Sequence, residues 1–201
     1  NDAGTILARA SVPLQTRYPQ PGWAEQSATD IWESVQSAIA RAVDQVGPDR
    51  IDAIAIANQR ETLVLWDSAS GRPICPAIIG QCRRTTEDCA RLIAAGHDPA
   101  VADATGLGIN PLFPASKLAW ALRNLPDVQT LHHAGRLRAG TVDSWLLWNL
   151  TGGAVFATTV QLEDLHYAVV VRHDGVLLSK ILSQSEEAES SKDGPAPVDG
   201  D

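Results

Sequence analysis

The sequence predicts an α/β fold, and three observations support this prediction. Segments with the 3.6-residue apolar period of a helix alternate with short apolar runs rich in isoleucine and valine. One such run, residues 51–57, contains three isoleucines and little polar alternation, which is typical of a strand covered on both faces in a parallel sheet. The chain is also long enough for one or two domains with a core, with 201 residues of which 44% are hydrophobic and 20% charged.

The beginning of the chain predicts a turn, a strand and a loop. Residues 1–4 are expected to form the turn, and residues 5–14 are β-prone, like the second arm of a hairpin whose first arm is absent from the sequence. A loop rich in Pro and Gly occupies residues 18–23. Because a strand edge without a partner invites association, we expect the isolated chain to be marginally soluble or to form homo-oligomers.

The first helix has clear start and stop signals. Ser27 begins it, and Asp30 completes a pattern that resembles a capping box. Gly47 and Pro48 end it. One face of the helix is apolar: Ile31, Trp32, Val35, Ala38, Ile39, Ala42, Val43 and Val46.

The middle of the chain predicts a hairpin followed by helices. After the strand at 51–57, a second strand at 62–66, a turn at 67–71 and a third apolar stretch at 74–79 have the order of a hairpin. Three further helices are predicted, at 85–95, 116–124 and 143–150.

Three short motifs suggest binding sites but lack the residues that such sites need. Gly106 and Gly108 lie in a loop at 106–111, without the third glycine or the preceding strand of a dinucleotide site. The arginine pair at 83–84 fits a phosphate or carboxylate site, but such a pair more often forms the polar start of a helix. The histidine pair at 132–133 has no third ligand nearby and is expected in a surface loop, so no metal site is predicted.

The last part of the chain differs in character from the rest. Two apolar runs, 169–171 and 176–178, flank a turn-like segment and predict a hairpin. From residue 183 onward Ser, Glu, Pro, Gly and Asp dominate, which predicts a disordered acidic tail. We therefore expect one domain over residues 1–159 and a separate segment over 160–201.

Composition excludes several classes of function. The formal net charge is −8, and no basic patch marks a nucleic-acid partner. No apolar run approaches the roughly 18 to 20 residues of a membrane span. The three cysteines, Cys75, Cys82 and Cys89, lack paired spacing and are expected to be free thiols in a reducing cytoplasm.

The strand at 51–57 ends abruptly at a group of large polar residues, 58–61. In open α/β sheets, ligands bind just beyond the carboxyl ends of strands. There the guanidinium of Arg60 offers only donors and the carboxylate of Glu61 only acceptors, so together they suit a hydroxyl-rich ligand. From these residues alone, a solvated charge pair at a loop is the alternative interpretation, and the favoured one.

Four motifs, in order along residues 1 to about 158, resemble the FGGY carbohydrate kinases, and especially their glycerol kinase branch. They lie at 21–32 (PGWAEQ, then DIW), 57–67 (ANQRET, then LWD), 81–85 (QCRRT) and 140–153 (GTVDSWLLWNLTGG). The resemblance implies an actin-like, ribonuclease-H-like domain, incomplete at its first hairpin. It also implies a second domain, and a cleft between the two in which ATP and Mg²⁺ phosphorylate a hydroxyl of a small polyol or sugar.

The resemblance also implies roles for individual residues. In the glycerol kinases the Arg and Glu of the matching motif bind substrate hydroxyls, which assigns substrate binding to Arg60 and Glu61. Two further pocket positions depart from the family: Gly80 stands where glycerol kinases have Trp, and Leu112 where they have Tyr. The phosphate-binding turn is expected before Asn1 and the catalytic Asp beyond the end of this sequence, so no catalytic residue is assigned to the chain.

Three hypotheses follow for the chain. It is the N-terminal, substrate-binding part of a glycerol kinase-like enzyme, expected to transfer no phosphate by itself. Alternatively, it is an inactive truncated or pseudogene product, since residues from 160 onward depart from the family pattern. In the third hypothesis Gly80 and Leu112 enlarge the pocket, and the substrate is a larger polyol or a ketose.

Overall fold

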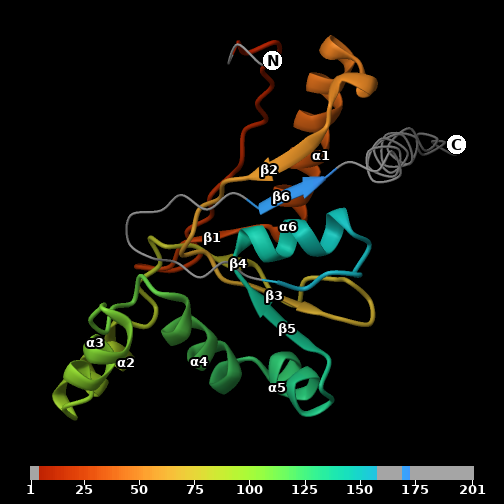
Figure 1. Cartoon of the computed structure of the whole chain (residues 1–201). Helices are drawn as coiled ribbons and strands as arrows, with labels where there is room; N and C mark the ends of the chain where they lie inside the picture. Colours follow the sequence, from red (N-terminus) through yellow and green to blue (C-terminus); the bar gives the residue numbers. More distant parts are fainter. Residues whose placement is uncertain (1–4, 158–168, 173–201) are drawn as a thin grey trace, which may run out of the picture. The chain divides into compact units, whose positions relative to one another are not determined.

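The computed structural model describes residues 5–157, together with the backbone of residues 169–172 (Figure 1). The chain divides into two units. The smaller unit contains Asn1–Pro13, Glu33–Ala55 and Val170–Asp201, and the larger contains Leu14–Trp32 and Ile56–Val169. The predicted turn at 1–4, the second apolar run at 176–178 and the acidic tail lie outside the described residues.

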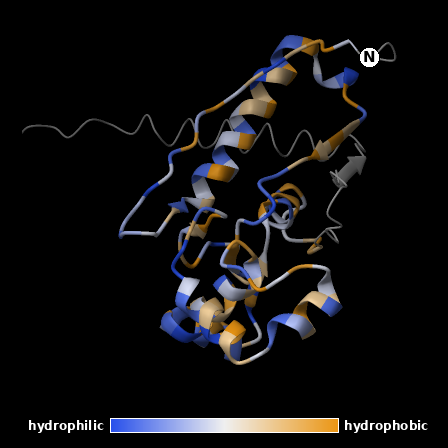
Figure 2. Ribbon diagram, turned by 90° about the vertical axis from the view of Figure 1, so that its left-hand side faces the viewer, coloured by the Kyte–Doolittle hydropathy of each residue, from blue (hydrophilic) through white to orange (hydrophobic). Residues whose placement is uncertain are grey.

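Helix α1, Ala28–Val46, confirms the prediction made from its start and stop signals. The backbone N–H of Asp30 donates to Ser27 Oγ over 3.1 Å, so Ser27 caps the first turn. Gly47 adopts a φ of 85°, which favours glycine, and a short 3₁₀ helix, Pro48–Arg50, follows. Figure 2 shows hydrophilic and hydrophobic residues mixed along α1, as its amphipathic sequence requires.

Strand β2, Ala53–Ile56, confirms a strand in the run at 51–57 but corrects its environment. Ala53 and Ala55 are exposed, and Ile56 is the buried residue of the strand, which pairs with β6, Val169–Arg172. The expectation of a strand covered on both faces is therefore wrong. Alanine counts as apolar in the sequence, but its small side chain gains little from burial. The run therefore alternates large isoleucines with small alanines that can face solvent.

Residues 5–14 contain no strand, contrary to the prediction. Ile6 is 68% exposed and Leu7 45% exposed, and backbone pairing begins with the bridge between Arg17 and Glu25. Apolar character alone does not make a strand, because a strand needs a partner. The predicted self-association loses its structural basis, since it assumed an open strand edge here.

The core of the larger unit is built around β3, Val64–Asp67, all four residues of which are buried. β3 pairs antiparallel with β5, Leu137–Gly140, and the two strands lie side by side in Figure 1. Bridges from Leu63 to Ile78 and from Trp66 to Pro73 join β3 to the following segment, which confirms the predicted hairpin. That segment includes β4, Ala77–Ile78, which pairs antiparallel with β1, Glu25–Gln26. The β1–β4 and β3–β5 pairs of the larger unit are thus both antiparallel.

The helices of the larger unit match the predictions in part. The structure confirms the three predicted helices as α2 (Thr86–Ala94), α4 (Pro114–Asn124) and α6 (Val142–Leu150). It adds two that were not predicted, α3 (Asp98–Thr105) and α5 (Pro126–His133). The histidine pair at 132–133 therefore ends a helix rather than lying in a loop. Pro126 begins α5 soon after α4 ends, because its fixed φ suits the first position of a helix.

Helix α6 packs against β5 and brings a cluster of aromatic side chains together. Trp66 is fully buried, with its ring centroid 5.4 Å from that of Trp145 and 6.0 Å from that of Trp148. Trp145 Nε1 donates to the carbonyl of Ala28 over 2.9 Å, which ties α6 to the start of α1. A methyl group added at Gly140 would lie 2.7 Å from Ser144 Cβ, so this close packing requires glycine in β5.

Asp67, at the end of β3, predicts a dependence of stability on pH. Arg136 Nε donates to Asp67 Oδ1 over 2.9 Å, and the Ala69 N–H and Ser70 hydroxyl donate to the same carboxylate over 3.0 and 2.8 Å. The Arg136 hydrogen bond, followed by the Ala69 N–H, holds the pKa of Asp67 well below its usual 3.8. Stability from this group is thus complete above its unfolded pKa and is lost as the pH falls towards the folded value.

Urea unfolding of the chain and of Asp67→Asn at about pH 7 and about pH 3 tests this expectation. The chain should lose more unfolding free energy on acidification than Asp67→Asn does. Exposed Asp127, replaced by Asn, is the control and should retain the full acid loss. An equal loss in chain and Asp67→Asn would contradict the expected linkage.

Candidate functional site

The segment that follows β2 is anchored to its surroundings before it enters β3. The N–H of Thr62 donates to the carbonyl of Gln59 over 3.2 Å and closes a turn that contains Arg60 and Glu61. Gln59 Nε2 donates to Gln26 Oε1 over 2.7 Å, and Gln26 Nε2 donates in turn to Thr16 Oγ1 over 3.1 Å. The polar turn is therefore held in place by a chain of amide contacts.

Three of the four predicted pocket residues come together. A methyl group added at Gly80 would lie 3.2 Å from Leu112 Cδ1 and 3.5 Å from Glu61 Cβ. Arg60 is exposed, and its charge acts on the Glu61 carboxylate. The end of the turn, the residue after the hairpin and the loop before α4 thus form one local site within the larger unit.

Glu61 has the environment of a carboxylate that can accept a ligand hydroxyl. The residue is half-buried, its Oε2 atom is shielded from solvent, and no donor among the described residues reaches that oxygen. Burial raises the pKa of Glu61, while the charges of Lys117 and Arg60 oppose the rise. An acceptor without a partner, facing two cations, suits a hydroxyl donor.

Lys117 is the site residue that the sequence analysis missed. It lies in α4, is fully buried, and donates from Nζ to the carbonyls of Glu61 over 2.6 Å and Leu112 over 2.5 Å. Burial lowers the pKa of Lys117 to about 8, against the opposing charge of Glu61. The signal in the sequence was its helical spacing, because Lys117 precedes buried Ala121 by one turn and must share its inward face.

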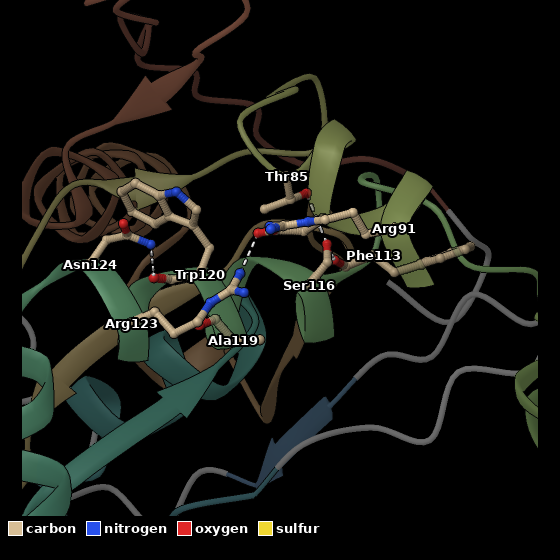
Figure 3. A network of polar contacts seen from close by, with 9 residues as sticks. Thr85, Arg91, Phe113, Ser116, Ala119, Trp120, Arg123 and Asn124 are labelled. Carbon is tan, nitrogen blue, oxygen red and sulfur yellow. Dashed lines mark hydrogen bonds and ion pairs between the residues drawn. The ribbon is translucent and has the colours of Figure 1, made fainter. Parts of the chain in front are cut away.

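Figure 3 shows polar contacts that join α2, and Thr85 just before it, to α4, the helix that carries Lys117. Thr85 and Ser116 share a hydrogen bond of 3.0 Å between their hydroxyls, and the Ser116 hydroxyl also lies 3.2 Å from the carbonyl of Phe113. At the other end of α4, Arg123 forms an ion pair with Asp88 of α2. The helix that carries Lys117 is therefore tied to its neighbour near both ends.

The arginine pair at 83–84 has divided roles. Arg84 donates to Glu25 Oε1 over 2.5 Å and its guanidinium lies 3.8 Å from the ring centroid of Trp23 and 4.8 Å from that of Trp120. Its side chain is only 3% exposed, so it binds an internal carboxylate and serves the core. Arg83 is exposed just before α2, where it fits the polar start of a helix.

Residues 1–162 match the family model described as FGGY family of carbohydrate kinases, N-terminal domain. The chain belongs to this family. It accordingly has the fold of the FGGY N-terminal domain, of the actin-like ATPase type, built here from mixed helices and small sheets. The resemblance drawn from the four sequence motifs is confirmed.

Curated relatives of this FGGY chain include several named glycerol kinase. That of Methylibium petroleiphilum is 50% identical over 157 residues, which are 77% of this chain and 32% of the relative. That of Paracidovorax citrulli is 44% identical over 162 residues, or 80% of this chain and 32% of the relative. The chain thus spans about a third of the length of the relatives it matches, with 32% coverage in both cases.

Solved structures of other FGGY kinases share the fold. Glycerol kinase from Plasmodium falciparum, solved with ADP, superposes with a TM-score of 0.67 at 28% identity, covering 71% of this chain and 29% of the other. Xylulose kinase from Rhodospirillum rubrum also gives a TM-score of 0.67, at 26% identity, covering 76% of this chain and 31% of the other.

The FGGY family uses ATP and Mg²⁺, so we tested the described residues for a matching site. Among residues 5–157, no three His, Cys, Asp or Glu side chains group closely enough to hold a metal ion. These residues therefore include no cluster of protein ligands that would hold a metal ion without help from a bound phosphate. Within the same residues, no helix is long and apolar enough to cross a membrane.

Proposed function

We propose that this chain is the N-terminal, substrate-side part of an ATP-dependent polyol kinase of the glycerol kinase type. Such an enzyme transfers the γ-phosphate of ATP to a hydroxyl of a small polyol or sugar. Membership of the FGGY family and relatives named glycerol kinase, up to 50% identical, support the proposal. We also propose a ribonuclease-H-like topology and a cytoplasmic location, the latter in keeping with three free cysteines.

The observation that carries the proposal is the unpartnered, shielded carboxylate oxygen of Glu61 beside Gly80 and Leu112. In this role Glu61 accepts a hydrogen bond from one hydroxyl of the polyol, and Arg60 donates to an adjacent oxygen. Leu112 and the backbone at Gly80 form the wall of the pocket. The contribution of these residues to the reaction is to bind and orient the hydroxyl compound, which is a large share of catalysis in phosphoryl transfer.

Titration of the purified chain with glycerol, followed by ¹H–¹⁵N NMR, tests the proposal. The expected result is saturable shifts centred on residues 59–62, 80–81 and 110–113, which Arg60→Ala weakens. Arg72, an exposed arginine in the β3–β4 turn, supplies the control, and Arg72→Ala should bind like the parent chain. Shifts that are absent, or that spread evenly over the surface, would contradict a polyol site here.

A second candidate, a kinase for a larger polyol or a ketose, rests on Gly80 and Leu112. Without the indole and phenol of glycerol kinases the pocket wall is thinner, and two xylulose kinases superpose with TM-scores of 0.64 and 0.67. The gain in space is only partial, because Leu112 Cδ1 already lies near the position of a side chain at residue 80. Parallel titrations with glycerol, xylitol and xylulose distinguish the candidates, since a clear preference for glycerol excludes the enlarged pocket.

A further inference from the structure

We propose that Lys117 is a positioning residue of the polyol site, which fixes the backbone on both sides of the pocket and supplies a positive charge that acts on the Glu61 carboxylate. This inference rests on the proposed function of the chain, because Lys117 can support polyol binding only if the site binds a polyol. Lys117 itself need not contact the polyol. The observations that carry it are the complete burial of the ammonium group and the identity of its two acceptors.

The two carbonyls that Lys117 binds come from opposite walls of the site. One belongs to Glu61, at the end of the turn that enters β3, and the other to Leu112, in the loop before α4. These two residues are also the nearest neighbours of Gly80. One ammonium group thus fixes the separation of the turn and the loop, and with it the direction in which the Glu61 side chain leaves the backbone.

Packing alone does not explain a lysine at this position. A buried ammonium loses its hydration, and an apolar side chain of similar length would fill the same space without that loss. Lys117 recovers stability only through its contacts, and the two described hydrogen bonds both go to the walls of the pocket. We therefore attribute the charged group at position 117 to the two backbone carbonyls that it binds.

The charge of Lys117 also acts on the Glu61 side chain. Burial raises the pKa of Glu61, and Lys117 is the stronger of the two cations that oppose this rise. The charged or titratable groups that act on Lys117 in turn are Glu61, Cys82, Arg83 and Arg84. Of these four, only Glu61 lies in the proposed pocket, so the Lys117–Glu61 pair is the coupling that matters for binding.

The experiment replaces Lys117 with methionine in the full chain and measures the Glu61 carboxyl by ¹³C NMR titration. The matched control is Arg72→Met, which removes an exposed cation from the β3–β4 turn, away from α4. In Lys117→Met the pKa of Glu61 should rise above its value in the parent chain, and glycerol binding should weaken about tenfold at neutral pH. Arg72→Met should leave both quantities unchanged.

A purely structural lysine gives a different result. If folded Lys117→Met keeps the parent pKa at Glu61 and the parent affinity for glycerol, the proposal is overturned. If the pKa of Glu61 rises but the parent chain itself binds no polyol, the coupling stands and the proposed function fails. The two ideas are therefore tested separately by the same variant.

A second measurement covers the case in which Lys117→Met does not fold. The chain has three lysines, Lys117, Lys180 and Lys192, so ¹⁵N-lysine labelling gives few ammonium signals. The Lys117 signal should titrate near its lowered pKa of about 8. Glu61→Gln removes the opposing negative charge and should move that titration to lower pH, whereas Glu87→Gln should not. An unchanged Lys117 titration in Glu61→Gln overturns the proposal.

Discussion

Replacement of Trp66 by alanine is expected to lower the free energy of unfolding by about 3–5 kcal/mol. Trp66 lies in the central strand of the larger unit, is fully buried, and contacts the rings of Trp145, Trp148 and Phe156. Its removal leaves a cavity that β3 and α6 cannot close without breaking the register between β3 and β5. Urea unfolding monitored by circular dichroism measures the loss.

Two variants sharpen this expectation. Trp66→Phe should cost far less, because the indole N–H of Trp66 is buried and has no acceptor among the described residues, so its loss removes an unsatisfied donor. Phe156 is 47% exposed, and Phe156→Ala is the control for loss of an aromatic ring at the edge of the same cluster. A Trp66→Ala variant no less stable than Phe156→Ala would show that β3 is not the centre of this core.

Replacement of Glu61 by glutamine is expected to weaken polyol binding by about 10- to 100-fold, the usual worth of a hydrogen bond to a charged acceptor. The amide keeps the size of the side chain but loses the charge that Arg60 and Lys117 face. Isothermal titration calorimetry with glycerol, at matched pH, measures the change. Exposed Glu87→Gln on α2 is the control for loss of one negative charge.

The same carboxylate predicts how binding depends on pH. Burial raises the pKa of Glu61 above 4.5, so on acidification it takes up a proton before an ordinary glutamate does. A protonated Glu61 loses charge as an acceptor, and polyol affinity should therefore fall at a pH above the usual glutamate range. Affinity that stays constant down to the ordinary value would argue against Glu61 as the acceptor.

Short-range signals in the sequence correctly predicted the helix ends and the hairpin turn. Ser27 and Gly47 gave the ends of α1 because capping is a short-range effect, and the turn at 67–71 gave the hairpin. The prediction of a strand at 5–14 was wrong because a strand needs a pairing partner, and the local sequence does not show whether one is present. β5 was missed because Arg138 and Gly140 interrupt its apolar character, and its pairing with β3 is what makes it a strand.

The candidate site shows the same division. Arg60 and Glu61 were singled out by their place after a predicted strand, and the family resemblance added Gly80 and Leu112. The structure brings Glu61, Gly80 and Leu112 into contact range, while the role of all four residues in binding is a proposal. Lys117 escaped notice because a lysine in a helix is usually exposed, and nothing nearby in the sequence shows that the carbonyl of Glu61, 56 residues earlier, will meet its ammonium group.

The acceptors of Lys117 have a consequence for how this site can change during evolution. A carbonyl oxygen is present whatever side chain the residue carries, so a substitution at position 112 can reshape the pocket without removing the acceptor that Lys117 binds. At residue 112 the backbone carbonyl therefore serves the structure of the site, and the side chain serves the choice of ligand. Under the proposed function, exchanges at position 112 would change the substrate that fits the pocket and leave the architecture of the domain intact.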